Sequence, residues 1–274
     1  MTNLSVNVNK LATLRNSRGG NAPDVTAMAR KILAYGAHGI TVHPRPDGRH
    51  IRTTDVYSLK ELMDAWRPTR PDSEHTAEHT AEHTAEYNAE YNIEGYPSEE
   101  FLRMLEDVRP DQATLVPDPP EALTSNAGWS LVRSEALLAP VLRRLRQAGI
   151  RVSLFVDPRA FTAEEKSALL KLKPDRIELY TEEFARAYGT GRREDVTEVY
   201  RSVALFALDN GIAVNAGHDL SQENLGYLVD RIPWIQEVSI GHALICEALE
   251  QGLQTTIGNY LKILRDANSH PARP

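Results

Sequence analysis

The stretch RVSLFVDPRAFTAEEKSALLKLKPDRIELYT, residues 151–181, contains one complete strand-helix-strand unit. Its two ends are short runs rich in β-branched and aromatic residues, which predict strands. Between them, Thr162 and Glu165 form a capping box, which predicts the start of a helix. Two apolar strands joined by a helix are typical of a parallel sheet whose outer face is covered by helices.

The same alternation extends along the whole chain and gives eight strand-helix pairs. The predicted strands are 4–9, 39–44, 91–95, 112–117, 151–157, 176–181, 212–217 and 237–241. The predicted helices are 23–36, 54–66, 98–108, 134–148, 162–172, 195–210, 221–231 and 242–266. Because eight such units close a barrel, the sequence predicts an α/β fold, a (β/α)8 TIM barrel, with residues 1–274 as a single domain. An open, doubly wound sheet is the structural alternative.

One segment interrupts the alternation before the third predicted strand. From Glu74 the tetrapeptide Glu-His-Thr-Ala occurs three times and is followed by Glu-Tyr-Asn-Ala and Glu-Tyr-Asn-Ile. Near-identical tandem copies without an apolar face predict a low-complexity insertion over residues 70–90, on the N-terminal face of the barrel. Metal binding is the alternative, since a four-residue period would place His75, His79 and His83 on one face of a helix.

Composition and charge limit the classes of partner. A net charge of −7 disfavours nucleic acid, and no apolar run approaches the ~18 residues of a membrane helix, so neither is an expected partner. The start of the chain lacks a signal-peptide pattern, which favours a cytoplasmic location. Cys246 lies in an apolar helical pattern and is predicted to be a small core residue. Residues 1–52 hold eight basic and two acidic side chains, a cationic cluster that suits small anions.

Polar side chains follow most of the predicted strands at the point where each strand ends. In a barrel these ends meet at one rim, where the active sites of this architecture lie. Amide, guanidinium, imidazole and carboxylate groups at one rim suit acid–base chemistry on an anion. The candidates are Asn7, Asn9, Arg15, Arg18, His43, Arg45, Arg49, His50, Glu94, Thr124, Glu178, Tyr180, His218 and His242.

The ends of the seventh and eighth predicted strands carry the most specific pattern. They have the sequences Val-Asn-Ala-Gly-His (214–218) and Ser-Ile-Gly-His-Ala (239–243). Glycine lets the backbone approach phosphate oxygens, and Gly241 and His242 begin a predicted helix whose positive end attracts an anion. A tight turn alone would also explain Gly241. The pattern favours a phosphate site at these two strand ends.

Seven motifs, in order along the chain, resemble the pyridoxine 5'-phosphate synthase family. They are Val6–Asn9, Ala12–Gly19, Gly39–Arg45, Arg49–Ile51, Val152–Asp157, Val214–His218 and Ile240–Ala243. The resemblance extends from about Leu4 to Leu264 and is interrupted only by the repeat.

The resemblance implies a reaction and a role for each site residue. It implies ring closure between 3-amino-2-oxopropyl phosphate and 1-deoxy-D-xylulose 5-phosphate, giving pyridoxine 5'-phosphate, phosphate and water, in a homo-octamer without cofactor or metal. By position, His43 and Glu94 would accept protons and His218 would donate one. The implied binding residues are Asn7 and Arg18 for the amino ketone, Arg45, His50 and Thr124 for the pentulose phosphate, and Asp219, Gly241 and His242 for the phosphate end.

The chain departs from the family pattern at two places. Many members have Asp-His where this chain has Asn9-Lys10, so neither residue is given an acid–base role. Many have glycine where this chain has Asp219, whose carboxylate must turn away from a bound phosphate. The repeat also places several glutamates in register with Glu94; the residues that flank Glu94 match the end of the third strand in the family and identify it.

Two other functions are compatible with the sequence. A metal-dependent sugar-phosphate isomerase or aldolase would use His43, Glu94, His218 and His242 as ligands. A non-catalytic binding module would act through the repeat. Barrels support many chemistries, so the fold alone does not decide among the three.

Overall fold

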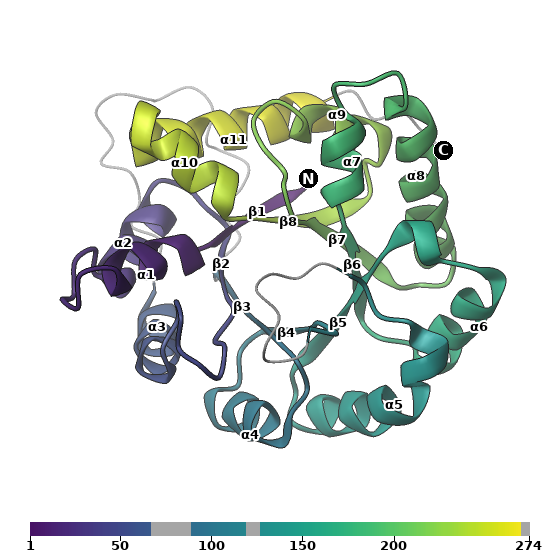
Figure 1. Ribbon diagram of the computed structural model, residues 1–274, viewed down its shortest axis with the longest axis horizontal. Coiled ribbons are helices and arrows are strands. Elements are labelled where there is room, and N and C mark those ends of the chain that lie inside the picture. Colours follow the sequence, from purple (N-terminus) through teal and green to yellow (C-terminus); the bar gives the residue numbers. More distant parts are fainter. Residues whose placement is uncertain (67–88, 119–126, 270–274) are drawn as a thin grey trace.

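The strands form a closed parallel barrel in the computed structural model, which describes residues 1–66, 89–118 and 127–269. Each strand pairs with the next, and β8 pairs with β1. The strands are β1 (Asn3–Asn7), β2 (Gly39–Val42), β3 (Glu90–Gly95), β4 (Gln112–Leu115), β5 (Arg151–Val156), β6 (Arg176–Tyr180), β7 (Ala213–Gly217) and β8 (Ile235–Ile240). The closed order confirms the TIM barrel and excludes the open sheet (Figure 1).

Helices surround the barrel in the order of the chain, as Figure 1 shows. They are α1 (Asn9–Asn16), α2 (Val25–Ala34), α3 (Thr53–Ala65), α4 (Glu99–Val108), α5 (Leu131–Gln147), α6 (Ala163–Leu172), α7 (Glu182–Ala187), α8 (Arg193–Asp209), α9 (Leu225–Arg231), α10 (His242–Gln251) and α11 (Leu253–Asn268), with a 3-10 turn at Pro158–Ala160. Side chains cap several of them: Asp24, Ser98 and Thr162 accept hydrogen bonds from first-turn N–H groups. None of the described helices is both long and apolar enough to cross a bilayer.

The structure differs from the prediction in three local features. Helices α1 and α7 are present but were not predicted. The last predicted helix divides at Gly252, whose φ of 81° breaks the helical path and leaves α10 and α11. Cys246 is exposed on α10, so its prediction as a core residue is wrong: the buried stripe of this helix contains Leu244 and Ile245 instead.

The two faces of the barrel strands differ in polarity. Outward-facing residues such as Leu4, Val6 and Ile93 are fully buried against the helices and form the hydrophobic core. Inward-facing residues are largely polar and bond across strands: Thr114 Oγ1 donates to Asn92 Oδ1 at 3.1 Å. Barrel interiors are more often filled by branched apolar side chains. This barrel therefore has a polar interior inside an apolar shell.

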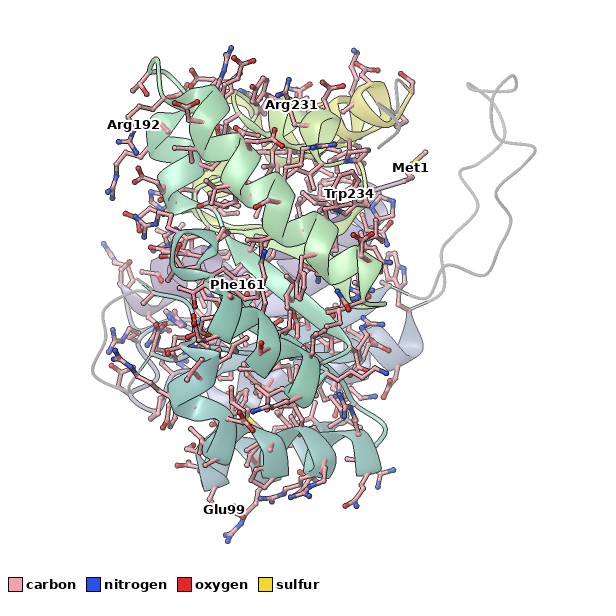
Figure 2. The ribbon with its side chains drawn as sticks, turned by 90° about the vertical axis from the view of Figure 1, so that its right-hand side faces the viewer. Met1, Glu99, Phe161, Arg192, Arg231 and Trp234 are labelled. Carbon is pink, nitrogen blue, oxygen red and sulfur yellow. The ribbon has the colours of Figure 1, made fainter. Side chains whose placement is uncertain are left out.

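Charged residues occupy the N-terminal end of that interior. Glu90 forms ion pairs with Arg151 and with Arg176, the latter at 3.4 Å. Glu237 lies nearby and is buried, which raises its pKa to about 8. Figure 2 shows Met1 and Arg192 at opposite ends of the barrel, the N-terminal face and the C-terminal rim. The predicted insertion lies almost wholly outside the described residues; its last unit begins β3 at Glu90.

Candidate active site

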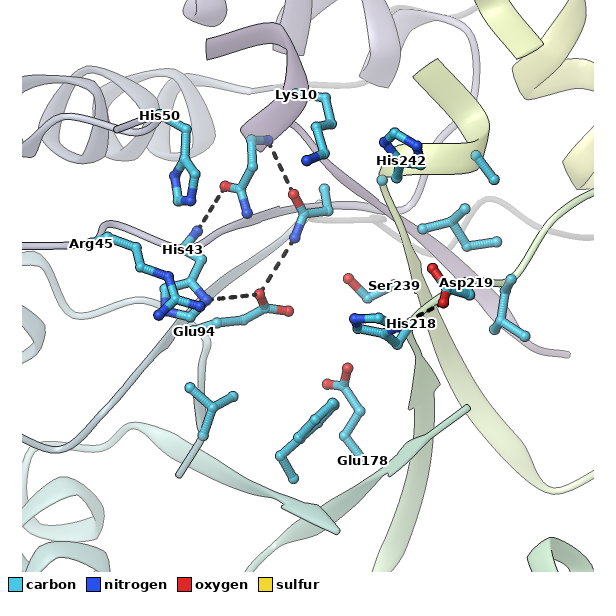
Figure 3. A pocket seen from close by; sticks show the side chains of 18 residues that line it. Lys10, His43, Arg45, His50, Glu94, Glu178, His218, Asp219, Ser239 and His242 are labelled. Carbon is cyan, nitrogen blue, oxygen red and sulfur yellow. Dashed lines mark hydrogen bonds and ion pairs between the residues drawn. The ribbon is translucent and has the colours of Figure 1, made fainter. Parts of the chain in front are cut away.

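A cavity of about 420 Å³ opens at the C-terminal ends of the strands. Figure 3 shows side chains from opposite sides of the barrel pointing into it. Nine of the predicted site residues line this cavity: Asn7, His43, Arg45, His50, Glu94, His218, Asp219, Gly241 and His242. Residues far apart in the sequence therefore meet around one space large enough for small phosphorylated molecules.

The two remaining predicted site residues do not line the cavity. Arg18 is exposed on the turn that follows α1. Thr124 lies outside the described residues. Asn9, Lys10 and Glu178 line the cavity as well. Asn9 and Glu178 were among the candidates at the strand ends, but no individual role was predicted for any of the three.

A chain of hydrogen bonds links β1, β2 and β3 at the rim. Asn9 Oδ1 accepts from the backbone N–H of His43 at 2.9 Å, and the backbone N–H of Asn9 donates to Asn7 Oδ1 at 3.0 Å. Asn7 Nδ2 then donates to Glu94 Oε2 at 3.4 Å, and the same oxygen lies 3.7 Å from His43 Nδ1 (Figure 3). These contacts fix the relative positions of the imidazole and the carboxyl group, as acid–base catalysis requires.

Burial shifts both groups toward their neutral forms. Burial lowers the pKa of His43 well below its usual value, and the charge of Arg45 lowers it further. Burial raises the pKa of Glu94 to about 8, with repulsion from the Asp118 carboxylate as the next cause. At neutral pH the site therefore holds an uncharged His43, which is able to accept a proton, beside a largely protonated Glu94.

Glu178 forms the floor of the cavity. Its side chain is buried, and Thr114 Oγ1 lies 3.5 Å from its Oε2. Burial, followed by repulsion from Glu94, raises the pKa of its carboxyl group. The carboxyl group lies over Gly217, where an added Cβ would be only 2.4 Å from Oε1. The only sequence signal for this position is its inward place on β6, next to the end of the strand.

The end of β7 has an unusual backbone. His218 and Asp219 have φ angles of 87° and 57°, a region that residues other than glycine rarely adopt. Thr181 Oγ1 holds the turn by donating to the Gly217 and His218 carbonyls, the former at 2.7 Å. The Tyr180 ring packs edge-on against the imidazole of His218, with 4.8 Å between the ring centroids. Strained backbone of this kind is concentrated at functional sites, where the surrounding structure fixes it.

Asp219 contacts its neighbour instead of projecting toward an anion. Its Oδ2 lies 3.2 Å from His218 Nδ1, and this contact lowers the pKa of the carboxyl group. A φ of 57° is a conformation that glycine adopts freely and that aspartate tolerates. The exchange of glycine for aspartate is therefore compatible with the turn.

Groups suited to anions lie on two sides of the cavity. On one side, Arg45 is buried and its Nη2 is 3.2 Å from Asp118 Oδ2, while the pKa of His50 falls to about 4 through burial and the charge of Arg45. On the other side, helix α10 begins at Gly241 without a side-chain cap, which leaves first-turn N–H groups for a ligand. Within the described residues, no cluster of three or more His, Cys, Asp or Glu side chains has the arrangement of a metal site.

Solved structures of low sequence identity share the fold. The tryptophan synthase alpha subunit from Legionella pneumophila superposes with a TM-score of 0.58 at 13% identity, covering 98% of this chain and 93% of that one. Thiamine phosphate pyrophosphorylase from Pyrococcus furiosus gives a TM-score of 0.52 at 14% identity, over 97% and 96% of the two chains. At these identities the likeness concerns the fold alone.

Sequence relatives are much closer. Pyridoxine 5'-phosphate synthase from Bacteroides fragilis is 47% identical and that from Cytophaga hutchinsonii 45%, each over 97% of this chain and 100% of the relative. That from Porphyromonas gingivalis is 46% identical over 95% of this chain and 98% of the relative. The family model of the pyridoxal phosphate biosynthesis protein PdxJ matches residues 4–266. The chain therefore belongs to the PdxJ family.

Proposed function

We propose that this protein is an enzyme with pyridoxine 5'-phosphate synthase activity and that the rim cavity joins 3-amino-2-oxopropyl phosphate to 1-deoxy-D-xylulose 5-phosphate. Membership of the PdxJ family and the names of the relatives support the activity. The observation that carries the assignment to this site is that His43, Glu94 and His218 line a single cavity. The homo-octamer and the cytoplasmic location are further parts of this proposal.

His43 and Glu94 act as proton acceptors in this proposal, and His218 acts as the proton donor. Imine formation, dehydration, phosphate loss and ring closure all require proton transfers near neutral pH. His43 is neutral and ready to accept a proton because burial lowers its pKa. The raised pKa of Glu94 makes it, once ionised, a stronger base than an ordinary carboxylate. Asp219 Oδ2 lies 3.2 Å from His218 Nδ1, where it orients the imidazole of the donor.

The phosphorylated ends of the substrates bind on the two sides of the cavity. Arg45 and His50, with Thr124, hold the pentulose phosphate, while Asn7 holds the amino ketone from the cavity wall. Arg18, exposed on the turn after α1, is the second residue proposed for the amino ketone. The backbone at Asp219, Gly241 and His242 holds a phosphate at the N-terminus of α10, where N–H groups and the helix dipole favour an anion. A carboxylate beside that phosphate is acceptable because Asp219 contacts His218.

The test is to incubate the purified protein with both substrates and to measure pyridoxine 5'-phosphate and inorganic phosphate. We expect His43→Asn to lower kcat/KM by about 10²- to 10⁴-fold, the usual contribution of a general base. His38→Asn is the matched control, because His38 precedes β2 and accepts a hydrogen bond from Leu4 N–H at 3.0 Å, outside the cavity. Equal activities of the two variants would contradict the proposal.

A further inference from the structure

Asp118 is a buried carboxylate that does not line the cavity but contacts a residue that does. It follows β4, and its Oδ2 lies 3.2 Å from Arg45 Nη2, with only 2% of the Asp118 side chain and 4% of the Arg45 side chain exposed. Within the described part of the chain, Arg45 Nε is buried without a hydrogen-bond partner. The guanidinium group is therefore held from one side and has donor capacity left for a ligand.

We propose that Asp118 is a positioning residue that holds the guanidinium group of Arg45 in place for the anionic group of the substrate. This role deepens the proposed function, on which it rests for the identity of the anion. The anion is a phosphate monoester, whose oxygens match the geometry of the guanidinium donors.

The ion pair of Asp118 and Arg45 also acts on Glu94. Because the pair has no net charge, an ionised Glu94 would add a buried negative charge without a partner of its own. Asp118 raises the pKa of Glu94 more than Arg45 lowers it. The groups that act on Glu94 from the surrounding elements are Asn7 on β1, His43 and Arg45 at the end of β2, Asp118 after β4, Glu178 on β6 and Glu237 on β8.

The test is a titration of the Glu94 carboxyl group in substrate-free protein, observed by carbon-13 NMR of glutamate-labelled samples and assigned by comparison with Glu94→Gln. We expect Asp118→Asn to lower the pKa of Glu94 by about one unit, since it removes a repelling charge. Arg45→Met should raise it, because an attracting charge is lost. The opposite signs separate an electrostatic role from general damage to the fold.

Asp157→Asn is the matched control, since Asp157 follows β5 at the same rim and pairs with Arg159 at 2.7 Å, outside the cavity. It should leave the titration of Glu94 unchanged. Asp118→Asn should also raise the KM for the pentulose phosphate by about 10-fold, a loss of 1.4 kcal/mol. A KM for the pentulose phosphate that is the same in Asp118→Asn and the wild type would overturn the inference. Because this outcome requires an active enzyme, it is distinct from an absence of synthase activity.

Discussion

Glu90 and Glu94 lie four residues apart on the inner face of the same strand, β3, and have opposite surroundings. Glu90 is at the N-terminal end of the barrel, between Arg151 and Arg176. Glu94 is at the C-terminal rim, where His43 and Asn7 are its contacts and burial raises its pKa. Glu90 is followed by Tyr-Asn-Ile and Glu94 by Gly-Tyr-Pro. The two glutamates differ in their surroundings because neighbouring strands supply arginines at one end of the barrel and an imidazole and an amide at the other.

The largest expected effect comes from removing the carboxyl group at the rim. Glu94→Gln should lower kcat/KM by about 10²-fold or more, because the amide cannot accept the proton. In the wild type, activity should rise with pH through about 8, since the raised pKa keeps Glu94 protonated below that value. Steady-state rates across pH 6 to ~9.5 check both points. Retention of the wild-type profile in Glu94→Gln would remove Glu94 from the catalytic set.

A smaller effect, on stability instead of chemistry, is expected at the other end of the strand. Glu90→Gln leaves Arg151 and Arg176 without their shared carboxylate and should lower the free energy of unfolding by about 2 kcal/mol, less than for a fully buried pair because Arg151 is partly exposed. Its kcat/KM should stay within about threefold of the wild type. Urea unfolding and the synthase assay measure the two quantities. A large loss of activity without loss of stability would contradict the comparison.

The smallest effect concerns Glu237, a buried glutamate near Glu90. Its folded-state pKa is raised from 4.5 to about 8, so the folded protein keeps a proton that the unfolded chain releases. Stability is therefore lost as pH rises from about 4.5 to about 8, and Glu237→Gln should remove this loss. Between pH 5 and pH 8 we expect the free energy of unfolding to fall by about 1 to 2 kcal/mol more in the wild type than in the variant. Thermal unfolding at the two pH values tests it; an equal pH dependence in both proteins would be evidence against a buried, protonated Glu237.

The sequence predicted the eight strands because strand periodicity and helix caps are local properties. Helix α1 was not predicted because its buried stripe includes Arg15, which pairs with Asp55 on α3 and so disguises the apolar pattern. Helix α7 has only six residues, too few for a periodic signal.

The candidate site likewise contains residues that the sequence locates and contacts that only the folded barrel creates. His43, Glu94 and His218 stand at strand ends, which the sequence alone locates. The contact of Asp118 with Arg45 crosses from one strand end to another and depends on side-chain directions in the closed barrel, which no local pattern encodes. The position of Glu178 over Gly217 depends on cross-strand register in the same way.

β3 begins at Glu90, inside the last repeat unit, so a change in the number of repeat units could alter the sequence of this strand. Each repeat unit has four residues, an even number, and side chains along a strand alternate with a period of two. Gain or loss of one unit by replication slippage would therefore supply β3 with the same inward glutamates and outward tyrosine. Copy number can then vary between generations without reversing the faces of the strand that carries the reactive carboxyl group.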